Sequence, residues 1–486
     1  MFWTHARTAT LGLLAAGCGS SLTGPGAVDG DTDALRTDSA AADPPDVVTY
    51  HRDVAPILRE HCGSCHTPGG IAPFSLQTYD DASRWAEAIL PAVLDRTMPP
   101  FDAREGEDCQ PPLPWKDDLR LSEAELATLT TWVDEGTYEG ARVVEPPPVA
   151  PDVIADSEAD AILPIAAPFE VDGDEDIYAC FRLEVPNDEK VWLEAVEVRP
   201  DNGAVVHHVL LWSDPDDQAA DRAGEDGVYR CSGTPDFFPT DLIGGWVPGG
   251  APIRMPEDTG ILLKPGATIV MNVHYHPTGA GKEIDRSALA VKWTTSPPSH
   301  HATGFLVDVP FLGEVQPGPN DPGKTRFQIP PGVPDHTETL ILDTGPIAEY
   351  LALLPLRIFS ITPHMHYLGR AMKVTILRGD APDDEEMCLV HTPEYRFDWQ
   401  TTYTYDGDVD ELPQILPGDR IKVECTYDNS PSNPYFGDAL AASGATEAQT
   451  VRWGEETGDE MCMAMLGLVI PPVDLGALLK QFDLGL

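Results

Sequence analysis

The spacing of apolar residues divides the chain into a helical part and a strand-rich part. Within residues 47–138, apolar side chains recur three or four positions apart, as at Val54 and Leu58, which predicts helices. Ser122 and Glu125 form a capping-box pattern just before another apolar face of this kind, which is typical of a helix N-terminus. We therefore predict a small all-α domain over residues 47–138.

From residue 169 onward, short apolar runs are separated by Pro, Gly and Asp, which predicts β-strands joined by turns. The clearest predicted strands are 191–198, 205–212, 268–275, 288–295, 339–342, 356–361, 372–377, 421–427 and 461–470. Short strands at regular spacing favour a sandwich, and a Pro- and Gly-rich stretch at 316–323 divides the region. We predict a multidomain protein with two all-β sandwiches in tandem, at 169–315 and 325–475.

The remaining segments are predicted to be connections. Residues 19–46 are rich in Gly, Ala, Asp and Ser and predict a flexible tether. Residues 139–168 contain a run of prolines that stiffens a linker, and residues 476–486 form a tail.

Charge excludes one class of partner. The chain has 486 residues, of which 80 are acidic and 31 are Lys or Arg, so its formal net charge is −49. Because nucleic acids bind cationic surfaces, this balance argues against a nucleic-acid partner. Hydrophobic residues make up 42% of the chain, which is enough to build cores and excludes global disorder.

Residues 1–18 predict an export signal. The apolar run at residues 9–16 is too short to span a bilayer, and the small residues that follow lead to Cys18, a pattern that resembles a bacterial lipobox. Under this interpretation Cys18 carries a lipid anchor, and the protein is exported to the periplasm, outer membrane or cell surface of a Gram-negative bacterium. A plain cleaved signal is the alternative. Nine cysteines fit one lipid-bearing Cys and an even remainder in an oxidising compartment.

The run Cys62-Gly63-Ser64-Cys65-His66 is the strongest local signal. Two thiols on one helical turn can form thioethers to both vinyl groups of a haem, and the next residue is then placed as an axial iron ligand. A redox dithiol normally requires a βαβ context, and a zinc site requires a second ligand pair. Neither is found nearby, so we predict a covalently bound c-type haem.

Met98, which is followed by two prolines, is the candidate for the second axial ligand. A thioether ligand raises the potential of a redox-active haem. A lone Met is usually a core residue, and His61 is a competing candidate on the wrong side of the attachment motif. Together these features make residues 47–138 resemble a class I cytochrome c domain.

Three histidine pairs suggest a metal site. They are His207-His208, His274-x-His276 and His364-x-His366. On a strand, residues i and i+2 share a face, whereas adjacent histidines share one only if the strand bends or ends there. Imidazole suits copper or zinc, and a nearby Met thioether selects Cu(I). For any single pair, an ordinary structural role is an equally good interpretation, and we predict that His300-His301 lies on an exposed loop without a metal.

The third pair lies in a stretch that resembles the copper type II, ascorbate-dependent monooxygenases, which include peptidylglycine α-hydroxylating and dopamine β-monooxygenases. One family signature has the form H-x-F-x4-H-T-H-x2-G. The stretch from Arg357 to Gly369 is similar to it, with Arg357 in place of the first His and Met365 in place of the Thr. The signature's last two histidines correspond to His364 and His366.

The resemblance implies two copper ions. The Asp-Glu-Met-Cys run that contains Met461 resembles a family motif whose Met is the third ligand of the oxygen-binding copper, beside the histidines of the signature. A His-His pair and a Val-His-Tyr strand resemble the family's electron-transfer site, here His207, His208 and His274. His276 is left over, as a supporting group or an alternative ligand.

The resemblance also implies a fold and cysteine pairings. The family fold is two jelly-roll-like sandwiches, each with one copper, facing across a solvent-filled cleft. The pairing of Cys109 and Cys388 stays open. The implied disulfides are Cys180–Cys231 and Cys425–Cys462.

The implied reaction is hydroxylation of a C–H bond with O2, with His364, His366 and Met461 as the catalytic set. Family members take electrons from ascorbate, and a periplasmic redox protein is another possible donor. We hypothesise that the haem supplies or relays the electrons here. The positions of the family's peptide-carboxylate clamp hold Thr362, Met463 and Met465, which argues for a small-molecule substrate other than peptidylglycine.

Two other functions are compatible with the same residues. One is a non-enzymatic electron-transfer or copper-binding lipoprotein, and the other is a structural surface protein with incidental histidines. An oxygen site that includes Met461 is unnecessary for copper storage, which favours the enzyme.

Overall fold

The computed structural model describes residues 47–68, 72–142, 153–173, 176–237, 241–248, 250–279, 281–309, 313–317, 326–352, 354–379 and 386–472. The predicted export signal with Cys18, the tether at 19–46 and the tail at 476–486 lie outside the described residues. Within the described residues, no helix is both long and apolar enough to cross a membrane.

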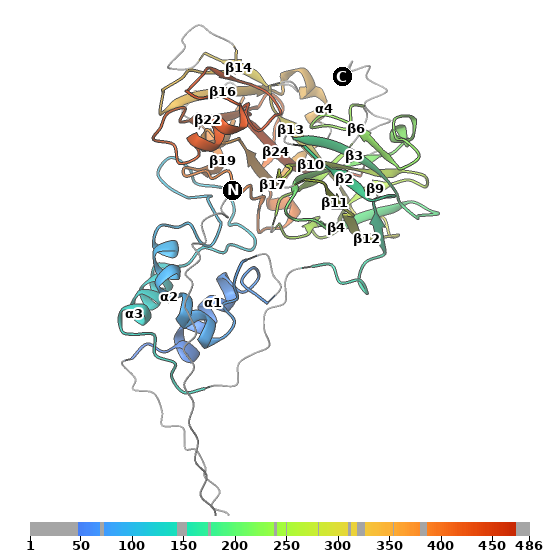
Figure 1. Ribbon diagram of the computed structural model, residues 1–486. Coiled ribbons are helices and arrows are strands. Elements are labelled where there is room, and N and C mark those ends of the chain that lie inside the picture. Colours follow the sequence, from blue (N-terminus) through green and yellow to red (C-terminus); the bar gives the residue numbers. More distant parts are fainter. Residues whose placement is uncertain are drawn as a thin grey trace, which may run out of the picture. The chain divides into compact units, whose positions relative to one another are not determined.

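The helical part has its own hydrophobic core. Its elements are η1 (Tyr50–Val54), α1 (Ala55–His61), α2 (Tyr79–Leu94) and α3 (Glu123–Asp134) (Figure 1). The Ser122 hydroxyl accepts a hydrogen bond from the Glu125 N–H, and the Glu125 carboxylate accepts one from the Ser122 N–H, so the predicted capping box begins α3. Tyr50 and Trp132 are buried at the centre of this core. That these helices form a cytochrome domain stays a prediction.

The first strand-rich half begins after the Pro-rich linker. The predicted strands at 191–198, 205–212, 268–275 and 288–295 agree with β4, β5, β10 and β12 to within a residue or two. The elements are β1 (Ala161–Pro164), β2 (Phe169–Val171), β3 (Ile177–Glu184), β4 (Val191–Arg199), β5 (Val206–Asp214), η2 (Gln218–Asp221), β6 (Val228–Arg230), β7 (Asp241–Trp246), β8 (Ile253–Arg254), β9 (Thr259–Leu263), β10 (Thr268–Tyr275), β11 (Glu283–Asp285), β12 (Ala288–Thr294), β13 (His300–Val307) and β14 (Glu314–Gln316).

The pair His300-His301 lies in a strand and not in the exposed loop that the sequence predicts. Both residues begin β13 and are half-buried. The His301 ring accepts a hydrogen bond from the Trp192 indole N–H at 3.3 Å. The prolines that precede the pair suggest a loop, but they end before the strand starts.

The second half is also mainly β. Its elements are β15 (Gln328–Ile329), β16 (His336–Asp343), η3 (Gly345–Ile347), α4 (Ala348–Leu351), β17 (Leu356–His364), β18 (Gly369–Leu377), β19 (Glu386–Thr392), β20 (Tyr403–Thr404), η4 (Val409–Glu411), β21 (Gln414–Ile415), β22 (Arg420–Tyr427), α5 (Phe436–Ala442), β23 (Val451–Arg452) and β24 (Met463–Ile470). A five-stranded sheet has the order β14-β16-β22-β18-β19. Small two-stranded sheets pair β2 with β11 and β15 with β23.

The two halves share one sheet. A 15-stranded sheet contains the path β1-β12-β4-β9-β13-β7-β5-β10-β3-β6, and β24 joins it by pairing antiparallel with β13 on one side and β17 on the other. At this crossing Gly467 lies opposite Gly304 and Ser360. A Cβ atom at Gly467 would lie 2.2 Å from the Ser360 hydroxyl, so the close approach of β24 and β17 requires glycine there. The strands are consistent with β-sandwich domains, but these sandwiches are joined through β24.

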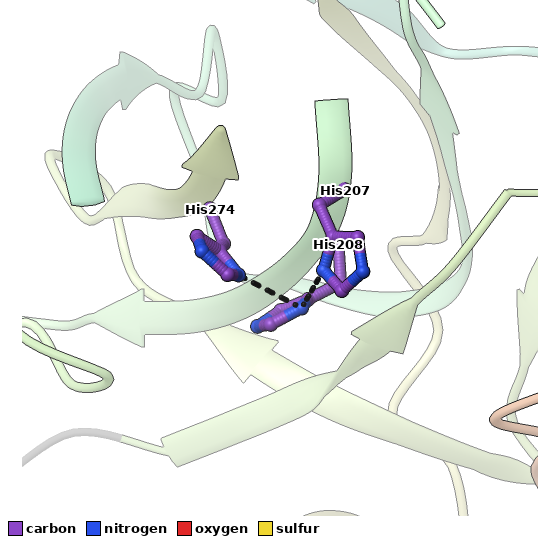
Figure 2. Close-up of side chains that lie close together, drawn as sticks. All are labelled: His207, His208 and His274. Carbon is purple, nitrogen blue, oxygen red and sulfur yellow. Dashed lines mark hydrogen bonds between the residues drawn. The ribbon is translucent and has the colours of Figure 1, made fainter. Parts of the chain in front are cut away.

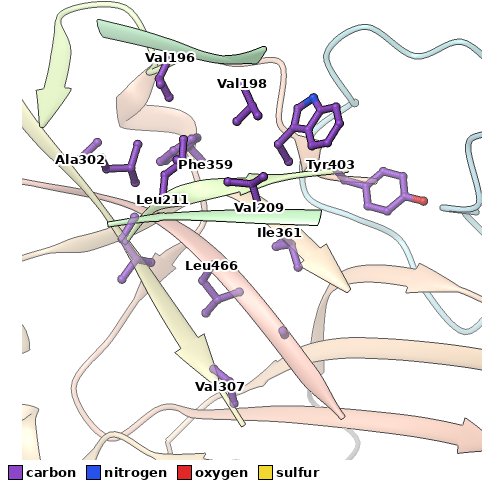
Figure 3. Close-up of a cluster of buried hydrophobic side chains, with 14 of the residues drawn as sticks. Val196, Val198, Val209, Leu211, Ala302, Val307, Phe359, Ile361, Tyr403 and Leu466 are labelled. Atoms are coloured by element: carbon purple, nitrogen blue, oxygen red, sulfur yellow. The ribbon is translucent and has the colours of Figure 1, made fainter. Parts of the chain in front are cut away.

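The hydrophobic core continues across both halves. Figure 3 shows Val209 and Leu211 from β5 in the same buried cluster as Ile361 from β17 and Leu466 from β24. Alternating residues of each strand point into this cluster, as the period-two pattern predicts. The shared core and the shared strand β24 hold β5 and β17, which carry histidines, in a fixed relation.

Part of the segment predicted as a helical domain packs against the second half. Phe101, Ala103 and Trp115 belong to the large β core, and the Trp115 ring stacks on Tyr405 with centroids 4.9 Å apart. The disulfide Cys109–Cys388 ties the same segment to β19.

The disulfides Cys180–Cys231 and Cys425–Cys462 confirm the pairings that the family resemblance implies. The third disulfide joins Cys109 to Cys388, the pair that the sequence left open. Three disulfides are typical of an exported protein that folds in an oxidising compartment. The bonds are Cys109–Cys388, Cys180–Cys231 and Cys425–Cys462.

Candidate metal centre

A β-bulge turns His207 and His208 toward the same side. In the β5–β10 ladder, His274 pairs with His208, but the next residue, Tyr275, pairs with Val206, so His207 is the extra residue. A bulge bends the strand and re-aims a side chain. Adjacent histidines on a regular strand would point to opposite faces, and this irregularity removes that obstacle.

Three imidazoles converge at this bulge. Figure 2 shows His207 and His208 on β5 facing His274, and the ligating atoms of the three residues lie within 4.8 Å of one another. The Nδ1 atom of His208 lies 3.1 Å from His207 Nδ1 and 3.4 Å from His274 Nδ1. The three Nδ1 atoms therefore surround one point that a single metal ion can occupy.

Neighbouring groups fix the ring of His274. Its Nε2 lies 3.2 Å from an Asp176 oxygen, and its face stacks on Tyr178 with centroids 4.3 Å apart. Because the carboxylate can only accept, Nε2 carries the proton and Nδ1 keeps its lone pair for a metal. The other Asp176 oxygen lies 2.7 Å from His276 Nδ1. Burial would raise the pKa of Asp176, but the hydrogen bonds from His274 and His276 hold it well below its ordinary value.

Burial keeps the rings of His207 and His208 neutral at neutral pH. Desolvation, with the nearby rings of His274 and His276, lowers the pKa of His207 to about 3. Desolvation and the neighbouring imidazoles also lower the pKa of His208 well below its ordinary value. Neutral imidazole is the form that binds metal ions.

His364 and His366 form a second pair at the end of β17, with ring centroids 5.2 Å apart. The Nδ1 of His364 lies 2.7 Å from the Gln400 side-chain oxygen, and the Nδ1 of His366 lies 3.1 Å from the Asp459 carbonyl. Both acceptors require a proton on Nδ1, so Nε2 of each ring has the lone pair. Desolvation lowers the pKa of His364 to about 4 and that of His366 to about 3.

Met461 lies just before β24, next to Glu460 and Asp459, which contact His366. The β17–β24 ladder ends with His364 opposite Met463, two residues after Met461. The buried Glu460 carboxylate accepts the backbone N–H groups of His366 and Leu368, which holds the two segments together. Burial raises the pKa of Glu460 to about 8. Met461 as a copper ligand stays a prediction.

The two histidine groups are adjacent. The ring centroids of His208 and His364 are 6.1 Å apart, so five imidazoles form one continuous cluster. The two histidine groups therefore lie in contact in this structure, whereas the family resemblance implies sites that face each other across a solvent-filled cleft. The physical reason is that β24 pairs with both β13 and β17 and draws the halves together.

The predicted haem motif continues α1 by another turn. The N–H groups of Cys65 and His66 both donate to the Cys62 carbonyl. Among the described cysteines, Cys62 and Cys65 are the ones outside disulfides. Burial, followed by the neighbouring Cys65, raises the pKa of the Cys62 thiol to about 12. The His66 Nδ1 donates to the Phe74 carbonyl at 3.0 Å, which leaves Nε2 available for an iron.

The two candidates for the second iron ligand differ in their surroundings. Both ring nitrogens of His61 are engaged, Nδ1 with the Leu119 carbonyl at 2.9 Å and Nε2 with Glu125 at 3.1 Å. This disfavours His61 as a ligand. Met98 is half-buried on the loop after α2 and stays a predicted ligand.

Several supporting residues have no motif that identifies them. Gln400, Asp176 and Tyr178 hold imidazoles, yet each stands alone in the sequence without a family signature. Glu460 belongs to the Asp-Glu-Met-Cys run, so that motif contained a signal for it. Phe397, whose ring stacks on His207 at 5.4 Å, also has no signal in the sequence.

Comparison with known proteins supports the copper assignment. Residues 329–439 match the sequence model of the copper type II ascorbate-dependent monooxygenase family, C-terminal domain. This range contains His364, His366 and Gln400, and it supports a copper-dependent oxidoreductase of the monooxygenase type. No curated protein matches the chain.

Solved structures add no functional argument. The major capsid protein P2 from bacteriophage PM2 is 12% identical and has a TM-score of 0.27, with 65% of this chain and 98% of that chain covered. The infectious bursal disease virus VP2 subviral particle is 11% identical and has a TM-score of 0.18, with 66% and 75% covered. Similarities this low do not bear on function.

Proposed function

We propose that the protein is an exported, copper-dependent monooxygenase that hydroxylates a C–H bond of a small molecule with O2 and draws electrons through a covalently bound c-type haem. The observation that carries the proposal is the cluster of five imidazoles, two of which lie within the family match. Neutral imidazoles in a partly desolvated cluster are a donor set that suits copper.

The residues divide into two copper sites. His207, His208 and His274 would hold one ion through their Nδ1 atoms. His364 and His366 would hold the second through Nε2, together with the Met461 sulfur. When bound, the copper ions would supply electron storage and O2 activation. The protein itself would fix ring orientation and the sites of protonation through Asp176, Gln400 and the Asp459 carbonyl.

The motif from Cys62 to His66, directly after α1, would hold the haem. Cys62 and Cys65 would form the two thioether links, His66 would bind the iron through Nε2, and Met98 would be the second axial ligand. A bound haem would supply a one-electron redox centre. The Phe74 carbonyl would hold the His66 proton on Nδ1 and so orient the ring. Ascorbate or a periplasmic redox protein would be the external donor.

Cys18 would carry a lipid anchor that attaches the exported protein to a membrane. Export is supported by the three disulfides, which require an oxidising compartment.

The substrate would be small and uncharged or cationic. Thr362 bonds to the Thr402 hydroxyl at 2.8 Å, and Met465 is buried in a cluster with Trp212 and Leu242. Met465 is therefore a core residue, and Met463 packs, partly buried, against the same cluster. None of the three positions carries the positive charge that would bind a peptide carboxylate.

Metal analysis of the exported full-length protein tests the proposal. We expect two coppers and one haem per chain, and one copper after either His207→Ala or His364→Ala. The matched control His300→Ala should keep both coppers. Reductant-driven O2 uptake should form an alcohol that contains labelled oxygen. A chain that binds zinc alone and lacks haem would overturn the proposal, and copper and haem without labelled alcohol would favour the non-enzymatic alternative.

A further inference from the structure

One short segment contacts the predicted haem-ligand loop and both histidine groups. The segment is residues 396–400, which follows β19 and lies within the family match. We call it the bridging segment. Its significance rests on the proposed function, because it matters only if a haem and two coppers are bound.

The first end of the bridging segment meets the loop that carries Met98. The Arg396 guanidinium donates to the Arg96 carbonyl at 2.9 Å, and Arg96 is two residues before Met98. The same guanidinium lies 3.9 Å from a carboxylate oxygen of Asp102, which is buried. These contacts hold the loop against the segment.

The other end of the bridging segment meets the histidine cluster. The Phe397 ring stacks on His207 with centroids 5.4 Å apart and an interplanar angle of 25°. Phe397 is 7% exposed, so the contact is shielded from water. Three residues further on, Gln400 binds the Nδ1 of His364. The contact with His207 is therefore made by the residue directly after Arg396, and the contact with His364 is made four residues after it.

A second aromatic group on the same side of the structure ends before it reaches the cluster. Among the described residues, the ring contacts of Trp115 are with Tyr403 and Tyr405, and those of Tyr403 are with Trp115 and Phe101. None of these rings contacts an imidazole of the cluster. Tyr178 stacks on His274 and Phe397 stacks on His207, and of these two rings Phe397 is the one whose neighbour in sequence, Arg396, bonds to the loop that carries Met98.

We infer that the bridging segment is the path by which electrons pass from the haem to the copper cluster, with Phe397 as the contact to His207. With both groups bound, each transfer would take one electron from a ferrous haem, which would become ferric, and give it to one Cu(II), which would become Cu(I). No covalent bond forms or breaks, and no proton needs to move. Two transfers supply the two electrons of one hydroxylation.

The test measures electron transfer without turnover. The full-length protein, with haem and copper bound and O2 and substrate excluded, receives one electron at the haem from a photochemical reductant. Haem absorbance then reports reoxidation, and the copper EPR signal reports reduction. Phe397→Leu should slow reoxidation about tenfold, within the range expected for a residue that couples two sites. Phe397→Tyr keeps an aromatic ring and should keep the rate.

Phe327→Leu is the matched control, because Phe327 is similarly buried but contacts Tyr427 instead of an imidazole. It should leave reoxidation unchanged. Copper content and the haem spectrum of each variant show whether folding and cofactor loading are intact, and they are readouts independent of activity. Loss of copper from Phe397→Tyr would show a structural role for Phe397 and overturn the inference.

The outcomes separate the inference from the proposed function. If copper accelerates haem reoxidation in the parent protein but Phe397→Leu transfers at the parent rate, the path is wrong and the proposed function stands. If reoxidation in the parent does not depend on copper, or no haem is bound, both fail.

Discussion

Three imidazoles of the cluster, those of His274, His364 and His366, have a neighbour that decides which ring nitrogen is free. Asp176 engages Nε2 of His274, whereas Gln400 and the Asp459 carbonyl engage Nδ1 of His364 and His366. The two sites therefore offer opposite ring nitrogens to a metal. Such outer contacts orient ligands and typically affect metal affinity when they are removed.

Gln400 provides a direct test at this scale. Gln400→Leu removes the acceptor for His364 Nδ1, so the ring loses its fixed orientation. Copper affinity at the His364–His366 site should fall about 10- to 100-fold, as is typical when a group that hydrogen-bonds to a metal ligand is removed. Titration against a copper chelator measures this. The His207 site should keep its affinity, and Gln400→Glu, which keeps an acceptor, should retain most binding. Two unchanged affinities in Gln400→Leu would contradict the assignment.

Asp308 predicts a pH dependence of stability away from the metal residues. It is fully buried, accepts hydrogen bonds from Trp453 Nε1 and the Val309 N–H, and burial raises its pKa to about 7. Between the ordinary carboxyl pKa and this value, the folded protein holds a proton that the unfolded chain has released. Stability from this group is therefore present at low pH and is lost as the pH rises toward 7.

Urea unfolding of metal-free protein at pH 4.5 and 7.5 measures the effect. Relative to the parent, Asp308→Asn should gain free energy of unfolding at the higher pH, by on the order of 2–4 kcal/mol. A difference between parent and variant that does not change with pH would show that Asp308 is ionised in the folded state.

At the scale of elements, the sequence predicted nine of the described strands but not their relations. Alternating apolar residues mark β4, β5, β10 and β12 because each strand buries one face, and this signal is local. The bulge at His207 leaves no such mark, since it depends on the register with β10. The pairing of β24 with both β13 and β17 is also non-local. The adjacency of the two histidine groups could therefore not be predicted from motif spacing alone.

The disulfide Cys109–Cys388 holds an element without regular structure against β19. Replacing both cysteines with Ser should lower the free energy of unfolding by about 2–5 kcal/mol, the usual cost of losing a native disulfide. Trypsin should also cleave more readily at Arg104, which lies in the tethered segment. Denaturant unfolding and timed proteolysis measure the two effects. Because Trp115 still packs on Tyr405, the segment should stay docked, and a variant that loses that contact as well should be cleaved faster.

At the scale of the whole molecule, the helical core and the β core are separate clusters, and the segment around Trp115 joins them by packing into the β core. The sequence predicted the helical and β parts, because their apolar periods differ. It did not predict that residues of the helical part would belong to the β core. That outcome depends on tertiary contacts between Trp115, Tyr403 and Tyr405, which are about 290 residues away in sequence.

The net charge of −49 predicts how electron donors reach the protein. A surface with this excess attracts cations and repels anions, and salt screens both effects. If the proposed haem is bound, its reduction by a small cationic donor such as hexaammineruthenium(II) should be about tenfold faster at low ionic strength than at high. Reduction by the ascorbate anion should change in the opposite direction. Stopped-flow traces of haem absorbance at the two ionic strengths measure both rates. If both donors respond to salt with the same sign, the entry point for electrons is shielded from the overall charge. A local cationic group such as Arg396 would then determine the charge that a donor meets.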